Sequence, residues 1–174
     1  MEAQTTFKTL DEIRLQCRFG LFSWQSLRAA LNGMDAEKSF FFADALLGHA
    51  LTVSRWLWPK RDASRERGEW LCKELTVPDD SPLRLSSLRE TLERPDESHE
   101  DWLAALENKN YIESSIMPQT AIGDVKPEIV QRHLDPDVLR YSFRQRSCEL
   151  AKIAEALRLL DHTATGWLRT HNPW

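Results

Sequence analysis

The chain has 174 residues, of which 41% are hydrophobic and 29% are charged, and its formal net charge is −4. This length and composition are typical of one globular domain with a core of its own. The negative charge argues against a protein that binds nucleic acid over its whole surface, although a local basic patch is compatible with it.

The three cysteines, Cys17, Cys72 and Cys148, are an odd number without metal-ligand spacing. We therefore expect reduced, buried thiols, no bound metal and no cofactor. The N-terminal residues lack the apolar stretch of a signal peptide, and the longest apolar run, at about 40–53, is interrupted and too short to span a bilayer. We expect a cytoplasmic protein with no membrane role.

Two long helices are predicted first. Apolar residues recur at intervals of three and four over residues 6–31, and Gly33 suits the left-handed conformation that follows a helix. Asp35 can cap a second helix over residues 36–58, which Pro59 ends. The second helix is expected to be the most buried.

Shorter helices are predicted next. Residues 70–75 can form one, and a third core helix is predicted over residues 81–93, with the Ser81 hydroxyl as its cap. Pro95 disfavours helical conformation at Arg94, so the chain should kink there. Helix is expected to resume with Ser98 as its cap, up to about residue 109.

The C-terminal third mixes irregular and regular structure. Residues 111–125 lack a helical period, and 135–137 are typical of a turn. Alternating apolar residues at 139–143 predict a short strand, paired with 129–134 or with the region of Ile112. The last helix is predicted over 147–170, capped by Ser147.

These elements predict an all-α fold: an antiparallel bundle of four to five helices in one domain over 1–174, with a short irregular or β-hairpin insertion. Three segments then carry a family resemblance: 55–60, 88–102 and 133–143. In order and spacing they resemble the HEPN superfamily, in particular the HEPN-like proteins of bacterial abortive-infection systems. The resemblance implies a helical bundle that works as a homodimer. It also implies metal-independent RNA cleavage by an arginine and a histidine four to six residues apart.

The chain departs from that motif. If Arg89 is the family's arginine, the histidine position holds Arg94, which cannot act as a general base, and the asparagine position holds Glu90. A second register pairs Arg94 with His99, across a spacer that contains two acids. The candidate catalytic residues are therefore Arg89, Arg94 and His99, of which only His99 is of a residue type that can act as a general base.

Other charged residues are weaker candidates. Five basic side chains gather around the end of the second helix and could bind nucleic acid, or could form ion pairs in a solvated loop: Arg55, Lys60, Arg61, Arg65 and Arg67. A second basic cluster has the same two interpretations: Arg140, Arg144 and Arg146. His49 is expected to be a hydrogen-bonded core histidine, and His133 is expected on the surface.

Two functional hypotheses follow. In the first, the protein is a catalytically degenerate HEPN-like domain that binds or scaffolds within a bacterial defence or toxin–antitoxin system, with a partner protein. In the alternative, it is an active metal-independent HEPN ribonuclease, a toxin that cleaves RNA as a homodimer. The missing histidine favours the first, and the Arg94–His99 spacing keeps the second open.

Overall fold

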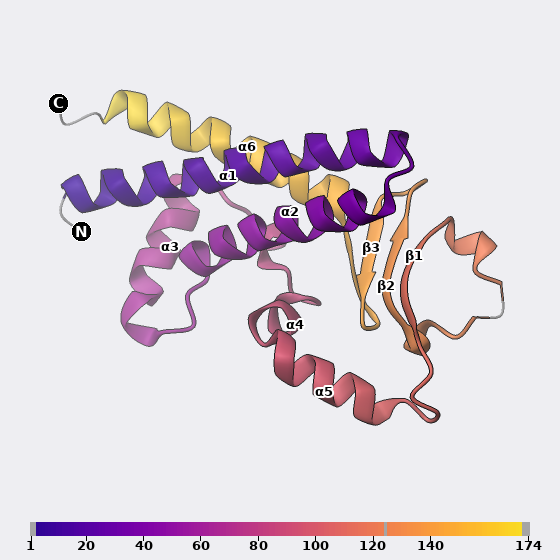
Figure 1. The fold of residues 1–174 in the computed structure, drawn as a ribbon. Coiled ribbons are helices and arrows are strands. Elements are labelled where there is room, and N and C mark those ends of the chain that lie inside the picture. The colour runs from indigo at the N-terminus through magenta and orange to yellow at the C-terminus, as the bar shows by residue number, and fades with distance from the viewer. Residues whose placement is uncertain (1–2, 124, 172–174) are drawn as a thin grey trace.

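The computed structural model describes residues 3–123 and 125–171, which form six α-helices and one four-stranded sheet (Figure 1). The helices are α1 (Ala3–Asn32), α2 (Ala36–Leu57), α3 (Arg65–Glu74), α4 (Arg89–Glu93), α5 (Pro95–Ala105) and α6 (Leu150–Thr170). The strands are β1 (Ile112–Ile116), β2 (Val130–Asp135), β3 (Arg140–Phe143) and β4 (Arg146–Glu149). The protein is thus predominantly helical with a β insertion.

The long helices α1, α2 and α6 pack side by side and supply much of the core. The predicted Asp35 cap of α2 is confirmed, because its carboxylate accepts a hydrogen bond from the Lys38 amide at 3.0 Å. The left-handed residue that follows α1 is Met34, with φ of 55°, and not Gly33 as the sequence suggested. Gly20 allows α1 to approach α6 closely: a Cβ there would lie 2.7 Å from the Leu157 Cδ1 atom.

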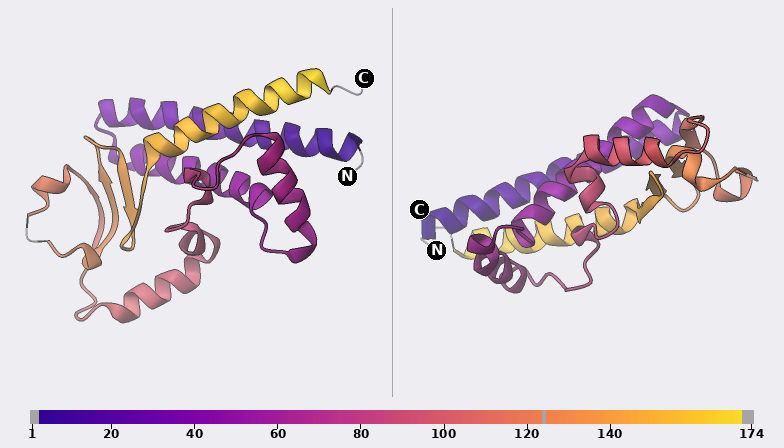
Figure 2. Two further views of the ribbon diagram at one scale, coloured as in Figure 1. Left: turned by 180° about the vertical axis from the view of Figure 1, so that it is seen from behind. Right: turned by 90° about the horizontal axis from the view of Figure 1, so that it is seen from below.

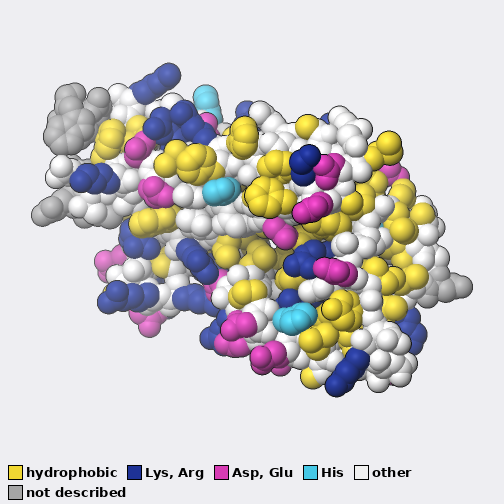
Figure 3. Space-filling model, viewed as in Figure 1, with side chains coloured by type: hydrophobic (Ala, Val, Ile, Leu, Met, Phe, Trp, Pro, Cys, Tyr) yellow, Lys and Arg dark blue, Asp and Glu magenta, His cyan; other side chains and the backbone are white. Residues whose placement is uncertain are grey.

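Large apolar side chains remain exposed on the α1–α2 pair. Phe19, Phe22 and Phe41 are 45%, 66% and 66% exposed, and we call these three the α1–α2 apolar surface. Figure 3 shows apolar side chains gathered over these two helices beside a histidine. Monomeric proteins rarely leave a group of large aromatic rings in water without a binding role.

The third core helix predicted over 81–93 forms only in its last part, as α4 over Arg89–Glu93. Ser81 accepts a hydrogen bond from the Leu83 amide as a cap would, but only a 3₁₀ turn follows, Pro82–Arg84. Leu85 then adopts a left-handed conformation with φ of 52° and is buried. Burial of this leucine outweighs the cost of its backbone conformation and breaks the helix.

The break at Arg94 is confirmed, but the helix resumes at once. Pro95 occupies the first turn of α5, where its missing N–H costs nothing, and Ser98 lies inside the helix rather than at its cap. Trp102 fixes α5 to the rest of the protein, since its indole N–H donates to the Glu128 carbonyl at 2.9 Å and its ring packs edge-on against Tyr111.

The prediction of a helical protein with a β insertion is confirmed in part, but the insertion is a four-stranded sheet and not a short hairpin, and the chain is not a bundle of four to five helices. The strand at 139–143 does pair with 129–134, as β3 with β2, and the Asp135 carboxylate accepts from the Asp137 and Val138 amides in the turn. However, β1 adds parallel to β2 and β4 adds antiparallel to β3. Ser147, predicted to cap the last helix, belongs to β4, and α6 begins at Leu150.

The missed hairpin has a physical cause. The two residues between β3 and β4, Arg144 and Gln145, both have positive φ, at 47° and 69°. Two-residue hairpin loops of this kind strongly favour Asn-Gly or Gly-Gly, so an Arg-Gln pair carries no hairpin signal. The Arg144 amide also donates to the Gln131 carbonyl at 2.9 Å, which holds the turn against the sheet.

The two faces of the sheet differ in chemistry. One face turns Leu134, Tyr141 and Phe143 into the helical core, where the Tyr141 hydroxyl donates to the Asp44 carboxylate at 2.6 Å. The opposite face is polar and includes His133. Figures 1 and 2 show the sheet between the long helices and an irregular segment made up of residues 117–123 and 125–129. That segment therefore covers the polar face.

Candidate functional sites

Arg89, at the family's arginine position, has its guanidinium turned into the protein. Its side chain is 16% exposed. Nε donates to the Glu93 carboxylate at 3.0 Å, Nη2 to the Trp58 carbonyl at 2.8 Å and Nη1 to the Ser54 hydroxyl at 3.4 Å. These bonds attach α4 to the C-terminal end of α2, so the guanidinium acts as a tie between two elements.

Glu93 is the centre of a small charge cluster. Its carboxylate is 9% exposed and is paired with Arg89, with Lys60 and, at 3.6 Å, with Arg55. Burial alone would raise the pKa of Glu93, but the hydrogen bonds from Lys60 and Arg89 outweigh it and hold the pKa below its ordinary value. Three of the predicted functional cations are thus committed to one buried anion.

The rest of the first basic cluster is also largely engaged. Arg65 pairs with Asp62 at 2.6 Å, and the Arg67 guanidinium lies over the Trp56 ring, 4.9 Å from its centre. Among the described residues, only Arg61 of the five has neither an ion pair nor an aromatic partner. The cluster is therefore mostly neutralised, in agreement with the solvated-loop interpretation.

Arg94 lies in an open cleft of about 480 Å³ between α4–α5 and the β3–β4 turn. It is 59% exposed and its Nη1 donates to Glu97 at 3.0 Å. Three arginines and three acids line this cleft, namely Arg94, Arg144, Arg146, Glu90, Glu97 and Asp101. Because the opposite charges are equal in number, the cleft offers no net positive field for a phosphate backbone.

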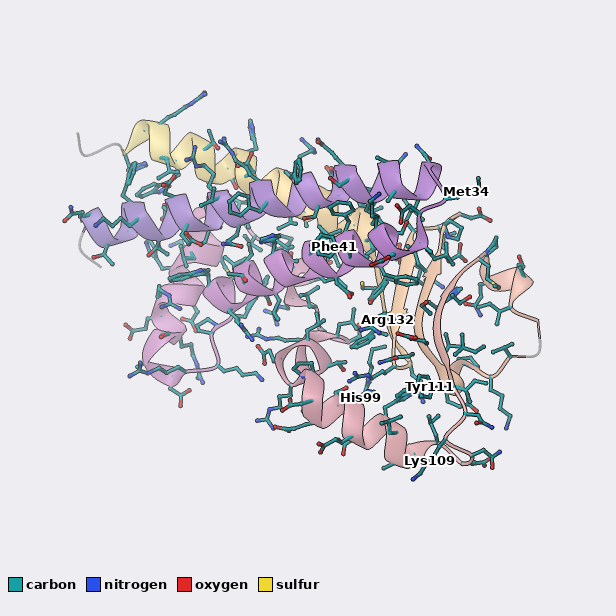
Figure 4. All side chains as sticks on the ribbon, in the orientation of Figure 1. Met34, Phe41, His99, Lys109, Tyr111 and Arg132 are labelled. Atoms are coloured by element: carbon teal, nitrogen blue, oxygen red, sulfur yellow. The ribbon has the colours of Figure 1, made fainter. Side chains whose placement is uncertain are left out.

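His99 is not among the residues that line this cleft. Its ring lies near Trp102, with centroids 6.1 Å apart, and its Nδ1 is buried without a hydrogen-bond partner in the described part of the chain. Figure 4 shows His99 on α5, with Tyr111 and Arg132 on the same side of the molecule. Within one chain, Arg94 and His99 do not converge on a shared cleft.

Sequence reasoning placed His133 wrongly. The residue lies on β2 and is only 5% exposed, instead of lying on the surface. The β2–β3 register places His133 on the polar face of the sheet. The segment that covers this face has no periodic apolar pattern, so nothing in the sequence indicated that His133 would be buried. His49 makes the hydrogen bond expected of it, between Nδ1 and the Gln16 side-chain oxygen at 2.8 Å.

Comparisons with known proteins do not assign this chain to a family. No family model, curated protein or solved structure matches the chain. Within residues 3–123 and 125–171, there is no group of three or more His, Cys, Asp or Glu side chains that could hold a metal ion. Over the same residues, every helix is too short or too polar to cross a membrane.

Proposed function

We propose that this protein is a HEPN-like domain without ribonuclease activity, which acts by binding a second copy of itself and a partner protein in a bacterial defence or toxin–antitoxin system. The observation that carries the proposal is the commitment of Arg89. A guanidinium that stabilises a scissile phosphate must have donors free to face it. Those of Arg89 bind Glu93, Trp58 and Ser54 in a largely buried position.

The distribution of charge supports binding of protein rather than of RNA. Nonspecific RNA affinity comes from several cations that neutralise phosphates together. Here the two basic clusters are interleaved with acids, and Glu93 alone holds Arg55, Lys60 and Arg89. A strand of phosphates would have to compete with these internal ion pairs.

The homodimer forms through the α1–α2 apolar surface in this proposal. Phe19, Phe22 and Phe41 are the large exposed aromatic residues on the two longest helices. A two-fold interface brings the same patch of both copies together, so one group of rings is sufficient for both sides. Aromatic side chains at the centre of a buried patch commonly dominate the free energy of association.

Ribonuclease assays test the absence of catalysis. Purified wild-type protein, His99→Ala and Arg94→Ala are incubated with labelled single-stranded RNA without divalent metal, and His162→Ala on α6 is the control. We expect no cleavage by any of them above the buffer blank. Cleavage by wild type and His162→Ala that both other variants lose would overturn the proposal and establish the active ribonuclease.

Sedimentation and light scattering test the dimer. We expect wild type at micromolar concentration to have twice the mass of the chain, and Phe22→Glu or Phe41→Glu to have the mass of one chain. Leu159→Glu is the matched control, since Leu159 is 52% exposed on a different long helix. A monomeric wild type would refute the dimer. Dissociation by Leu159→Glu alone would place the interface on α6 instead.

A further inference from the structure

A small pocket lies between the polar face of the sheet and the segment 117–129. Its volume is about 210 Å³, below the range of roughly 300–1,000 Å³ that is usual for drug-sized ligands. Six polar residues line it: Gln119, His133, Arg140, Ser142, Gln145 and Ser147. The covering segment adds an apolar side through Ile122, Val125 and Pro127.

The central observation is the state of His133. The side chain is 95% buried, and neither ring nitrogen has a hydrogen-bond partner among the described residues. Burial lowers the pKa of His133, although the charge of Asp135 and a hydrogen-bonding contact with the Ser115 backbone act in the opposite direction. The ring is therefore neutral at neutral pH, with one N–H donor and one acceptor, and neither nitrogen makes a hydrogen bond of good geometry to the described residues. A buried polar group without a partner is costly, and such groups are frequently completed by a ligand.

The strand register aligns further donors with this ring. His133 on β2 is the direct partner of Ser142 on β3, and Ser142 is the direct partner of Ser147 on β4. Side chains of cross-strand partners lie on the same face of a sheet. Two serine hydroxyls thus continue the row that the imidazole begins, and all three residues line the pocket.

Arg140 adds a permanent positive charge. Its cross-strand partners are Asp135 and Glu149, but both carboxylates are occupied elsewhere. Asp135 accepts hydrogen bonds from three backbone amides, and Glu149 pairs with Lys152 at 3.0 Å. Over residues 3–123 and 125–171, Arg140 has no ion-pair partner within 4.0 Å. Its guanidinium donors remain available to the pocket.

We propose that this pocket binds a small organic oxyanion, a carboxylate or a phosphate ester with a short apolar body. Arg140 and the two serine hydroxyls hold the charged head, and the His133 ring forms part of the polar wall beside it. The apolar body lies against Ile122 and Val125. A donor-rich site with one unpaired guanidinium suits anionic oxygen, because charge-assisted hydrogen bonds are the stronger ones. This binding site is independent of the dimer and of any RNA chemistry.

The test follows the imidazole of His133 by NMR in protein with ¹⁵N-labelled histidine. Isobutyrate is the carboxylate probe and ethyl phosphate the phosphate probe. Isobutyramide is a neutral probe of nearly the same shape as isobutyrate. We expect one of the two anions to cause a saturable shift of the His133 signals, which identifies the head group, and isobutyramide to cause none.

Two variants then test whether Arg140 supplies the positive charge that binds the anion. Arg140→Gln, at an exposed position where unfolding is not expected, should weaken binding of the effective anion at least tenfold. Arg146→Gln is the matched control, since Arg146 lies on the neighbouring strand and lines the other cleft. Absence of a saturable shift with both anions would overturn the proposal. So would equal binding of isobutyramide, or binding by Arg140→Gln that matches wild type.

Discussion

Replacing Arg89 by alanine should destabilise the protein strongly, although the family motif would assign this residue to RNA chemistry. The substitution removes two hydrogen bonds that join α4 to the end of α2 and one bond to Glu93 within α4. It also leaves Glu93, which is 9% exposed, with fewer positive partners. The structural role predicts a loss of folding stability, whereas a purely catalytic role predicts none.

The size of the effect follows from the environment of the pair. Removing one partner of a buried ion pair costs roughly 3–5 kcal/mol, and hydrogen bonds to charged groups contribute about 1.5–3 kcal/mol. Lys60 and Arg55 stay close to Glu93, but they are 63% and 54% exposed and compensate only in part. We therefore expect a loss of about 2–3 kcal/mol, which corresponds to a fall in Tm of roughly 5–10 °C for a chain of this size.

Urea denaturation and thermal unfolding, both followed by circular dichroism, measure the loss. Arg94→Ala is the control, because the Arg94–Glu97 pair is exposed and should contribute less than about 1 kcal/mol. The double variant Arg89→Ala/Glu93→Gln should regain part of the stability, since no buried charge is then left short of partners. If Arg89→Ala unfolds at the same urea concentration as Arg94→Ala, the structural assignment of Arg89 is wrong.

Three further outcomes are expected. Gly68→Ala should destabilise by about 1–3 kcal/mol, because its Cβ would lie 2.6 Å from a carbonyl oxygen of α2 and from the following proline ring, neither of which can move freely. Gly48→Ala should stabilise by about 0.5–1 kcal/mol, because this exposed position inside α2 has nothing within 4 Å of an added Cβ. The urea unfolding midpoints of both variants are compared with that of wild type, and midpoints equal for all three proteins would refute the packing argument. Finally, the lowered pKa of His133 means that the unfolded chain binds a proton near pH 6.5 while the folded protein does not, so stability should decline as the pH falls below about 6.5. His49 acts in the same direction, so His133→Gln should reduce the decline measured between about pH 7.5 and pH 5.5 without abolishing it; an unchanged decline would refute the assignment to His133.

The sequence pattern was sufficient to predict those helices that bury one continuous apolar face. The apolar period of α1, α2 and α6 predicted all three, and the Asp35 cap and the break at Arg94 are where the sequence indicates them. The Asp-Pro turn and the alternating apolar residues also predicted the strand β3, and its pairing with β2 is one of the two alternatives that the sequence left open. In these segments the neighbours along the chain decide the conformation.

Elsewhere distant contacts decided the outcome. Leu85 takes a left-handed conformation because its burial against the core is worth more than a continuous helix. The β3–β4 turn uses Arg144 and Gln145, whose residue types give no hairpin signal. A parallel partner such as β1 has no local signature either, since it joins β2 only through a long connection.

The candidate sites show the same division. Composition identified the cations of 55–67, and the family resemblance identified Arg89, Arg94 and His99, as the residues to examine, because the charge and the residue type of a side chain are visible in the sequence. Which donors are free is a property of the fold. Tertiary contacts commit Arg89 to Trp58 and Ser54, separate Arg94 from His99, and bury His133 beside Ser142. A guanidinium or an imidazole acts on a ligand only if its donors are not already used within the protein, and only the assembled structure decides that.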